Sequence, residues 1–382
     1  MNEMFEQGPI RPPSEARSLL IRVTRNCPWN KCAFCHTYRG TAFSLRTVAE
    51  IKEEITRIRQ IADQIRQWSW RQGDGGRITD RLVNRIYSRE DDVDDGYRSV
   101  AAWLYFGSTS VFLQDANSLI MKTDDLAEVL TFIKAQFPSV GRITTYARSH
   151  TAARRSVEDF VKLREAGLTR IHIGMESGYD PLLAFIRKGV TAADHVTGGQ
   201  RIVAAGISLS EYVMPGLGGR RWSREHALAT ADAINRINPE FARLRTLHVV
   251  PGTDLHDLMT RGEFQPLSDE KILREIRCFI EALNGIETTL VSDHILNLLE
   301  ELEGKLPEDK ARLLATVDRY FALPDEDRRI YRLGRRRGVY RRLDDLADAR
   351  VYRRLQDVVS AYHEGDPGRL DQHLDGIMNR YI

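Results

Sequence analysis

The chain has 382 residues, of which 42% are hydrophobic and 29% are charged, and its formal net charge is +2. This composition is close to that of ordinary globular proteins, and no stretch approaches the roughly 18 unbroken apolar residues that a membrane span requires. Residues 1–17 are polar and contain three prolines, so they lack the basic and then apolar layout of a signal peptide. We therefore expect a cytoplasmic protein with one large α/β domain and a smaller appendage.

The first part of the chain alternates one strand with a long helical stretch. Residues 18–24 are apolar and partly β-branched, which predicts a buried strand, and the cysteine-containing loop follows at once. Apolar residues then recur at helical spacing over 44–72, with Ser44 as the expected N-cap, until glycines at 73–76 break the pattern. Residues 77–109 indicate further helices around an acidic turn at 90–95.

From residue 110 onward, strands and helices alternate regularly. The pattern predicts strands at 110–114, 142–147, 170–175, 207–213 and 242–250, and helices at 124–136, 156–166, 193–205 and 223–237. With the first strand this gives six strands in a parallel sheet, either open and doubly wound or closed into an incomplete (β/α) barrel. In both architectures, functional residues gather at the C-terminal ends of the strands. We assign residues 1–265 to this core, with a helical insertion at about 66–109, and 266–382 to a C-terminal helical region.

The four cysteines are distributed unevenly. Cys27, Cys32 and Cys35 form a C-x4-C-x2-C pattern in one loop, whereas Cys278 lies in a distant helical stretch. Such a cluster does not suit a disulfide framework; three thiolates on one loop can hold three corners of an iron–sulfur cubane and leave the fourth iron open. Zinc is the main alternative, but a structural zinc site takes four ligands and His36 adjoins Cys35 too closely to complete one without strain.

This loop resembles the cluster loop of the radical S-adenosylmethionine (SAM) superfamily. The usual motif of that superfamily is C-x3-C-x2-C with an aromatic residue before the third cysteine, a position that Phe34 occupies here. The first spacing is one residue longer than usual, because residues 28–31 separate the first two cysteines.

Motifs after the later strands extend the resemblance, which covers about residues 18–258. The segment FLQDANSL stands where the superfamily binds the SAM amine, and Gln114, Asp115 and Asn117 supply acceptors there. It is similar to the acidic version of the branch near oxygen-independent coproporphyrinogen oxidase and the methylthiotransferases. Arg148 ends the next strand, where a carboxylate of SAM or of a substrate can sit.

The segment GMESGYDPLLAFIRKGVT is similar to the ribose motif of the same branch. The resemblance implies that Glu176, with its neighbour Ser177, meets the ribose hydroxyls and that Lys188 meets the carboxylate or sulfonium side of SAM. It further implies that Gly216, in VMPGLGG, belongs to the glycine-rich turn near SAM and that the backbone near Val250 reads the adenine.

Taken together, the resemblance implies an α/β fold, a partial (β/α)6 TIM-like barrel with a C-terminal helical extension. The implied cofactors are a 4Fe–4S cluster and SAM, and the implied enzyme is an oxidoreductase that cleaves SAM reductively to a 5′-deoxyadenosyl radical for hydrogen abstraction from a small molecule. A flavodoxin or ferredoxin is the expected reductant. Two alternatives stay open: an RNA-modifying enzyme similar to the methylthiotransferases, and a non-catalytic protein that carries a cluster or haem.

Several other polar residues have two interpretations on the sequence alone. His172, Tyr146, Glu211 and His248 lie on predicted strands, so each faces either a substrate or the wall of the barrel. His294 lies in the predicted helical tail, where we favour helix packing over a place at the barrel mouth. Eight arginines lie between 328 and 342; we favour a solvated helical face balanced by nearby aspartates, and so expect no nucleic-acid partner.

Overall fold

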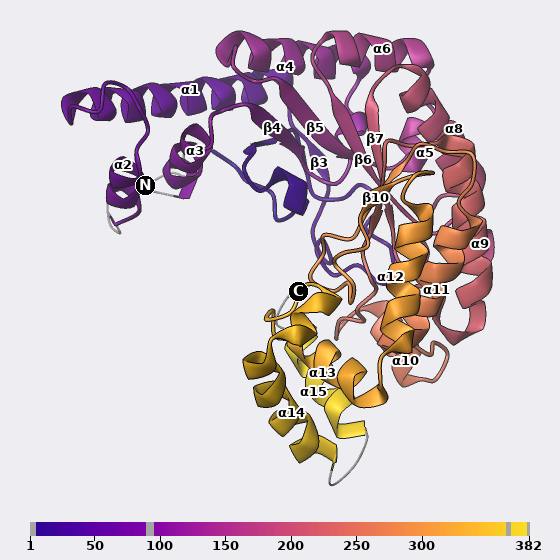
Figure 1. Ribbon diagram of the computed structural model, residues 1–382. Helices are drawn as coiled ribbons and strands as arrows, with labels where there is room; N and C mark the ends of the chain where they lie inside the picture. The colour runs from indigo at the N-terminus through magenta and orange to yellow at the C-terminus, as the bar shows by residue number, and fades with distance from the viewer. Residues whose placement is uncertain (1–4, 89–94, 364–367, 380–382) are drawn as a thin grey trace. The chain divides into compact units, whose positions relative to one another are not determined.

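The computed structural model describes residues 5–88, 95–363 and 368–379 (Figure 1). In the described part of the chain, eight strands form one sheet in the order β1-β4-β5-β6-β7-β8-β9-β10, and β2 (Thr24–Arg25) pairs with β3 (Ser44–Leu45). The eight are β1 (Leu19–Arg22), β4 (Ser110–Gln114), β5 (Arg142–Ala147), β6 (Arg170–Glu176), β7 (Ser208–Val213), β8 (Phe241–Leu244), β9 (Thr289–Val291) and β10 (Gly304–Lys305).

The sheet is mostly parallel, and helices follow its strands. The pairs β1–β4, β4–β5, β5–β6, β7–β8 and β8–β9 are parallel, and β9–β10 is antiparallel. This arrangement confirms the predicted α/β fold, a partial TIM-like core followed by helices. By compactness the chain divides into one unit of Met1–Asn30, Thr37–Ile173 and Arg201–Leu209 and another of Lys31–His36, Gly174–Gln200 and Ser210–Ile382.

In the first unit, a row of helices covers the strands β1, β4 and β5. The helices α1 (Val48–Arg71), α4 (Thr123–Gln136) and α6 (Val157–Glu165) lie side by side above these strands in Figure 1. Isoleucines at helical spacing fill the buried face of α1: Ile51, Ile55, Ile58, Ile61 and Ile65. Shorter helices are α2 (Asp80–Tyr87), α3 (Asp95–Tyr105) and α5 (Ser149–Ala152).

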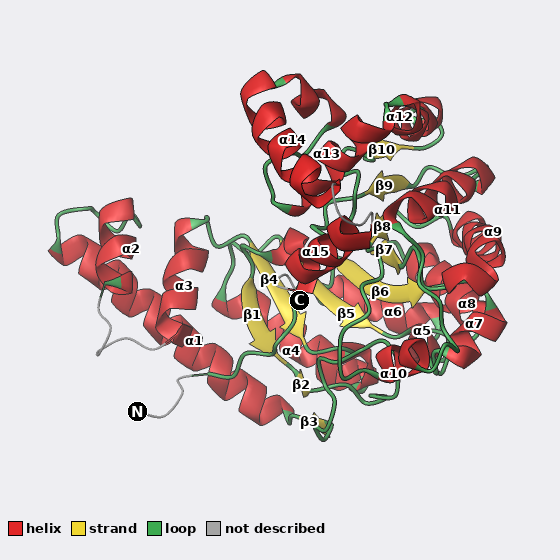
Figure 2. Ribbon diagram, turned by 90° about the horizontal axis from the view of Figure 1, so that it is seen from below, coloured by secondary structure: helices red, strands yellow, loops and turns green. Residues whose placement is uncertain are grey.

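The second unit contains two groups of helices. The helix α11 (Asp269–Ala282) packs against α9 (Gly219–Ile237) and α12 (Lys310–Ala322). The helices α13 (Asp325–Arg336), α14 (Ala349–His363) and α15 (Gly368–Met378) form a separate group, which Figure 2 shows together. The short helices α7 (Asp180–Phe185) and α10 (Asp254–Thr260) precede them in the chain, and α8 (Ala192–Ala204) lies between β6 and β7.

The structure corrects three details of the predicted elements. Helix α1 begins after Thr47, which forms a capping box with Glu50, and the predicted cap Ser44 belongs to β3. Strand β8 ends at Leu244, so residues 245–250 form a loop rather than strand. Residues 292–303, with His294, are not helical, and β9 and β10 flank them. Most of the expected acidic turn, 90–94, lies outside the described residues.

The arginine-rich segment is partly buried rather than wholly solvated. Arg335 and Arg336 are each 1% exposed; Arg336 pairs with Asp269 at 2.6 Å and Arg335 with Glu300 at 3.2 Å. Burial alone would raise the pKa of Asp269, but the charges of Arg336 and Arg332 lower it to about 2. These cations therefore fix α13 against its own unit. Among the described helices, none is long and apolar enough to cross a membrane.

Candidate active site

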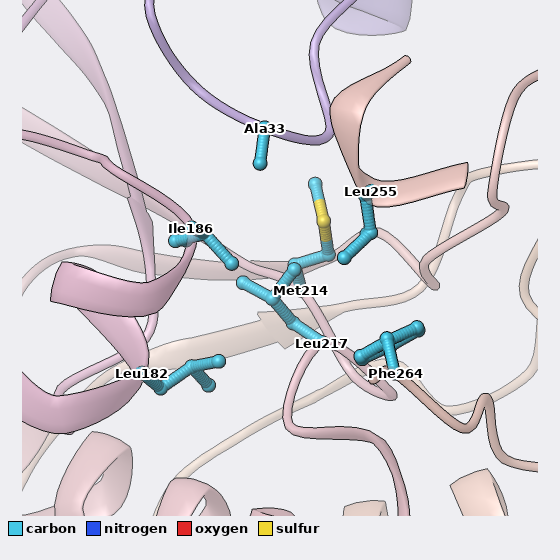
Figure 3. Packing of buried hydrophobic residues seen from close by; sticks show 7 residues of the cluster. All are labelled: Ala33, Leu182, Ile186, Met214, Leu217, Leu255 and Phe264. Atoms are coloured by element: carbon cyan, nitrogen blue, oxygen red, sulfur yellow. The ribbon is translucent and has the colours of Figure 1, made fainter. Parts of the chain in front are cut away.

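Half of the cysteine loop is anchored in the second unit through Ala33. Its N–H donates to the Ile186 carbonyl at 2.8 Å, and its own carbonyl accepts from Leu255 N–H at 2.9 Å. Figure 3 shows the apolar cluster around it, in which buried side chains pack closely: Ala33, Leu182, Ile186, Met214, Leu217, Leu255 and Phe264. This packing fixes the backbone between Cys32 and Cys35.

The two cysteines of this half-loop flank an aromatic contact. Cys35 N–H donates to the Cys32 carbonyl at 3.2 Å, and the ring of Phe34 lies 5.7 Å from Lys188 Nζ. All four cysteines of the chain are free thiols of intermediate exposure. No group of three or more His, Cys, Asp or Glu side chains in the described ranges is arranged to hold a single metal ion.

Cys27 lies in the first unit, in a turn stabilised by asparagines. Asn30 N–H points to Cys27 Sγ at 3.4 Å, and the Asn30 amide donates to the carbonyls of Tyr38 and Thr41. Asn26 and Asn30 both have positive φ angles, 66° and 48°, a conformation that asparagine adopts more readily than most residues. Neither residue was predicted from the sequence to have a role, although asparagine is a common turn residue.

Asp115, at the end of β4, receives donors from the chain itself. Arg22 Nη2 lies 2.7 Å from Asp115 Oδ2, the N–H of Asn26 donates to the same oxygen at 3.0 Å, and Tyr38 Oη donates to Oδ1 at 2.8 Å. Burial and the Asp115 charge raise the pKa of Tyr38 far above its usual range, so the hydroxyl keeps its proton. The preceding Gln114 amide binds the backbone of Gly8 and Ile10.

Asn117 and Arg148 also lie together in the first unit. Asn117 Oδ1 accepts from Arg148 N–H at 3.1 Å, and its Nδ2 donates to Thr151 at 2.9 Å. The Arg148 guanidinium lies 4.9 Å from the centre of a Trp29 ring, within the distance of a cation–π interaction. The cysteine loop thus contacts the residue after β5.

Glu176, the last residue of β6, has a left-handed backbone with φ 63°. A residue other than glycine is strained in this conformation, and such strained residues are frequent in functional sites. The Glu176 carboxylate pairs with Lys188 Nζ at 3.0 Å, and both side chains are nearly buried. A Cβ at Gly174 would lie 2.3 Å from Glu176 Oε1, so a larger residue there would force this carboxylate to move.

Glu211, on β7, is a buried carboxyl without a protein partner. It is fully buried, and within the described residues neither of its oxygens has a hydrogen bond. Burial, together with the charge of Glu176, raises the pKa of Glu211 well above 4.5, while Lys188 acts in the opposite direction. A buried polar group of this kind is uncommon and calls for a ligand or water.

The remaining predicted residues lie in turns after β6, β7 and β8. Ser177 Oγ lies 2.8 Å from the ring of His226, and Gly216 N–H donates to Glu275 at 2.6 Å. The Val250 carbonyl accepts from Thr253 Oγ1 at 2.7 Å. A cavity of about 460 Å³ lies beside these turns, and its lining includes Gly216, residues 246–249, Pro251 and side chains of α15.

From the sequence, His172 and Tyr146 could face either a substrate or the barrel wall. In the structure they belong to a group of packed aromatic rings. His172 is fully buried, 3.6 Å from Glu15, and its ring lies 5.9 Å from that of Tyr146 and 6.4 Å from Phe112. His248 Nε2 lies 2.7 Å from Asn379 Oδ1. His294 lies in the loop after β9, where burial and nearby arginines lower its pKa to about 3.

The residues available for the implied cofactors suit them chemically. Three free thiols on one loop are the usual ligands of an iron–sulfur cubane. Lys188 offers a cation and Glu176 an acceptor to a polar organic ligand. Glu211 adds a buried acid whose oxygens have no hydrogen-bond partner among the described residues. We conclude that both groups fit the donor sets present.

Comparison with known proteins identifies a family model and distant relatives. The model described as "Radical SAM superfamily" matches residues 21–231. The tRNA uridine(34) acetyltransferase of Methanocaldococcus jannaschii is 25% identical over 123 residues, which are 32% of this chain and 22% of that protein. The protein of the same description from Methanocaldococcus infernus is 25% identical over 122 residues, or 32% and 23%. The chain therefore spans less than a quarter of the length of these curated relatives.

Solved structures that align with this chain are also distant in sequence. Methylornithine synthase aligns with a TM-score of 0.42 at 14% identity, covering 78% of this chain and 68% of that one. Coproporphyrinogen III oxidase from Escherichia coli aligns with a TM-score of 0.42 at 11% identity, covering 69% and 52%.

Proposed function

Because this chain belongs to the radical SAM superfamily, whose cofactors are a 4Fe–4S cluster and SAM, we propose that Cys27, Cys32 and Cys35 are the cluster ligands of this radical SAM enzyme. When bound, the two cofactors supply a one-electron reductive cleavage that yields a 5′-deoxyadenosyl radical for hydrogen abstraction. Asp115 positions the loop on the Cys27 side by accepting from Arg22 and Asn26, and Ala33 positions the loop on the other side.

SAM is held by the polar residues after β6 and on β7. Glu176 accepts hydrogen bonds from the ribose hydroxyls, Lys188 neutralises the carboxylate of SAM, and Ser177 stiffens the turn. Glu211 adds a buried carboxyl to this group. The single observation that carries the assignment is that both Glu211 oxygens are buried without a partner among the described residues, because a ligand hydroxyl would satisfy them.

The other residues that the sequence predicts as SAM contacts also have roles within their own units. Arg148 and Asn117 hold the turn after β5, Gln114 and Asp115 form the polar end of β4, and Phe34 covers Lys188. The Gly216 turn and the backbone at Val250 contact the adenosyl part. The cavity of about 460 Å³ beside them takes a small-molecule substrate, a size that suits such a ligand. The reaction takes place in the cytoplasm with a flavodoxin or ferredoxin as reductant.

SAM cleavage tests this proposal. Anaerobically reconstituted protein, reduced with dithionite, is incubated with SAM, and the products are separated by chromatography. We expect 5′-deoxyadenosine from the wild type and from Cys278→Ala, and none from Cys32→Ala. Methylthioadenosine in its place would show that a different bond is cut, and equal activity of Cys32→Ala would refute the cluster assignment.

A second candidate function is action on RNA. It is favoured by the match of 123 residues to a protein described as a tRNA uridine(34) acetyltransferase. Against it, Arg332, Arg335 and Arg336 are paired with acidic residues of their own unit rather than presented as a basic face. The SAM-cleavage assay, repeated with total tRNA at physiological salt, distinguishes the two functions. An RNA-dependent rise in 5′-deoxyadenosine formation would favour this second function.

A further inference from the structure

His226, on helix α9, connects two turns that follow neighbouring strands in the chain. Its ring is 1% exposed; Nδ1 lies 2.8 Å from Ser177 Oγ, and Nε2 lies 3.1 Å from the Met214 carbonyl oxygen. Because a carbonyl oxygen only accepts, Nε2 carries the proton and Nδ1 accepts from the Ser177 hydroxyl. Burial lowers the pKa of His226 to about 4, so this neutral form persists at neutral pH.

The turn after β6 rests directly on the backbone of α9. Gly178 N–H donates to Thr230 Oγ1 at 2.9 Å, one helical turn beyond His226. A Cβ at Gly178 would lie 2.3 Å from the Ala229 carbonyl oxygen, so the helix and the turn approach as closely as glycine permits. Helix α9 is therefore a rigid support for residues 177 and 178.

Glu176, whose backbone is strained, immediately precedes the supported residues 177 and 178. Its carbonyl accepts from Met214 N–H at 3.0 Å, and its φ of 63° is held although glutamate disfavours it. Such a conformation persists only where its surroundings over-determine it. His226 holds Ser177, which follows Glu176, and Met214, whose N–H donates to the Glu176 carbonyl. One imidazole therefore constrains the backbone around Glu176.

Helix α11 extends the same support to the glycine-rich turn. Glu275 accepts from Gly216 N–H at 2.6 Å through Oε1 and from Ser223 Oγ at 2.6 Å through Oε2. The Glu275 side chain is buried, and His226 Nε2 lies 3.6 Å from its Oε1. Ser223 and His226 share helix α9, so the supports of the two turns form one buried polar group.

We propose that His226 is a positioning residue for SAM: it sets the spacing of the turn after β6 and the turn after β7, and so the direction of the Glu176 carboxylate. His226 does not touch SAM. The inference rests on the proposed function, because it requires SAM to bind at these two turns. It adds a determinant of SAM affinity that lies outside the strand-end motifs.

A matched pair of substitutions separates the two hydrogen bonds. In His226→Asn the amide oxygen replaces Nδ1 and keeps the bond from Ser177, whereas in His226→Gln the amide nitrogen replaces Nε2 and keeps the bond to Met214. His226→Leu removes both. SAM affinity is measured by anaerobic equilibrium dialysis on the reconstituted protein, with iron content and melting temperature determined on each preparation.

We expect His226→Leu to weaken SAM affinity on the order of tenfold, as loss of a buried hydrogen bond would, and each amide variant to weaken it less. Adding Ser177→Ala should weaken affinity in the His226→Asn background, which retains that bond, and have little effect in the His226→Gln background. Iron content should stay at the wild-type level. If His226→Leu does not fold, the two amide variants still give the comparison.

Three outcomes decide the matter. Wild-type affinity in both amide variants, with lowered melting temperatures, would overturn the positioning role, because His226 would then only stabilise the fold. If Glu176→Ala loses SAM while the His226 variants bind normally, the proposed function stands and this inference fails. If the wild type itself does not bind SAM, the proposed function fails and this inference with it.

Discussion

Two buried carboxyl groups, that of Asp115 just after β4 and that of Glu211 within β7, have opposite surroundings. Asp115 is 0% exposed and accepts from Arg22, Asn26 and Tyr38, so the chain supplies both of its oxygens with donors. Glu211 is also 0% exposed, yet neither oxygen has a partner among the described residues. The first lies beside the Arg22 guanidinium, and burial raises the pKa of the second well above 4.5.

The difference separates residues that shape a site from residues that face a ligand. A carboxylate that is satisfied by the protein holds its donors in place, here the loop that carries Cys27. A buried carboxyl without partners lowers the stability of the protein unless a bound group completes its hydrogen bonds. The sequence predicts Asp115 as an acceptor for the SAM amine and leaves Glu211 facing either a substrate or the barrel wall, so only the contacts distinguish their roles.

The largest effect that would test this comparison is the loss of Asp115. We expect Asp115→Ala to lower the free energy of unfolding by about 3–5 kcal/mol, because Arg22 would lose a partner in a largely buried pair. Asp115→Asn keeps an acceptor and should lose less. Chemical denaturation measures both variants. A loss below about 1 kcal/mol for the alanine variant would mean that Asp115 does not hold the loop.

A third buried carboxyl, Glu275, lies between these extremes and makes stability depend on pH. It has two donors but no cation, and burial raises its pKa from 4.5 to about 7. Because the folded chain holds a proton that the unfolded chain releases, stability falls as pH rises from 4.5 to 7, by about 3 kcal/mol in all. His226 has the opposite effect. Because its pKa is lowered from 6.5 to about 4, it makes the free energy of unfolding decrease as pH falls below 6.5.

The variant Glu275→Gln isolates this contribution. Its amide accepts from Gly216 and donates to Ser223, so both hydrogen bonds survive without the titration. Relative to this variant, the wild type should lose stability between pH 5 and pH 8. Denaturant midpoints across that range measure it, and parallel pH profiles for the two proteins would show that Glu275 is not protonated when buried.

Glu211 should respond in the opposite direction to Asp115. Glu211→Met fills a similar volume without a polar group, and we expect the SAM-free protein to gain about 1–3 kcal/mol of unfolding free energy. Glu211→Gln serves as the control, because its amide is equally unsatisfied and should gain less. A clear loss of stability in the methionine variant would indicate that the protein itself satisfies this carboxyl.

The smallest effect concerns the strain at Glu176. Glu176→Gly and Glu176→Ala both remove the pair with Lys188 and differ only in the fit to a φ of 63°. The glycine variant should be more stable by about 1 kcal/mol, because an L side chain disfavours the left-handed region. Thermal unfolding of the two variants measures this. Equal stability would mean that Glu176 is not held in that conformation in solution.

Strong local patterns allowed much of the fold to be predicted. The strands at 110–114 and 142–147 have the predicted bounds, because each is a short apolar run between turn residues. The predicted strand at 242–250 failed after Leu244, since its alternation continues into a loop held by tertiary contacts such as that of Thr246 with Asn297. The predicted helix cap Ser44 was wrong, because Thr47 forms the capping box with Glu50 three residues later.

The site was predicted less completely than the fold. Motif order predicted Glu176 and Lys188 as SAM contacts, which stays a prediction, and the structure pairs their side chains at 3.0 Å. The support of the cysteine loop by Tyr38 and Arg22 could not be read from sequence, because those contacts join residues 77 and 93 positions away from Asp115. Likewise, the contacts of His226 and Glu275 could not be predicted, because both residues lie in helical segments with an ordinary amphipathic pattern.

SAM binding by Glu211→Met measures whether the buried carboxyl faces the ligand. We predict that this variant, although at least as stable as the wild type and equal to it in iron content, binds SAM at least about tenfold more weakly in anaerobic equilibrium dialysis, because the ligand loses the hydrogen bonds of a buried carboxyl. An unchanged SAM affinity in a folded, cluster-containing Glu211→Met protein would contradict the claim that this unpaired carboxyl faces the ligand.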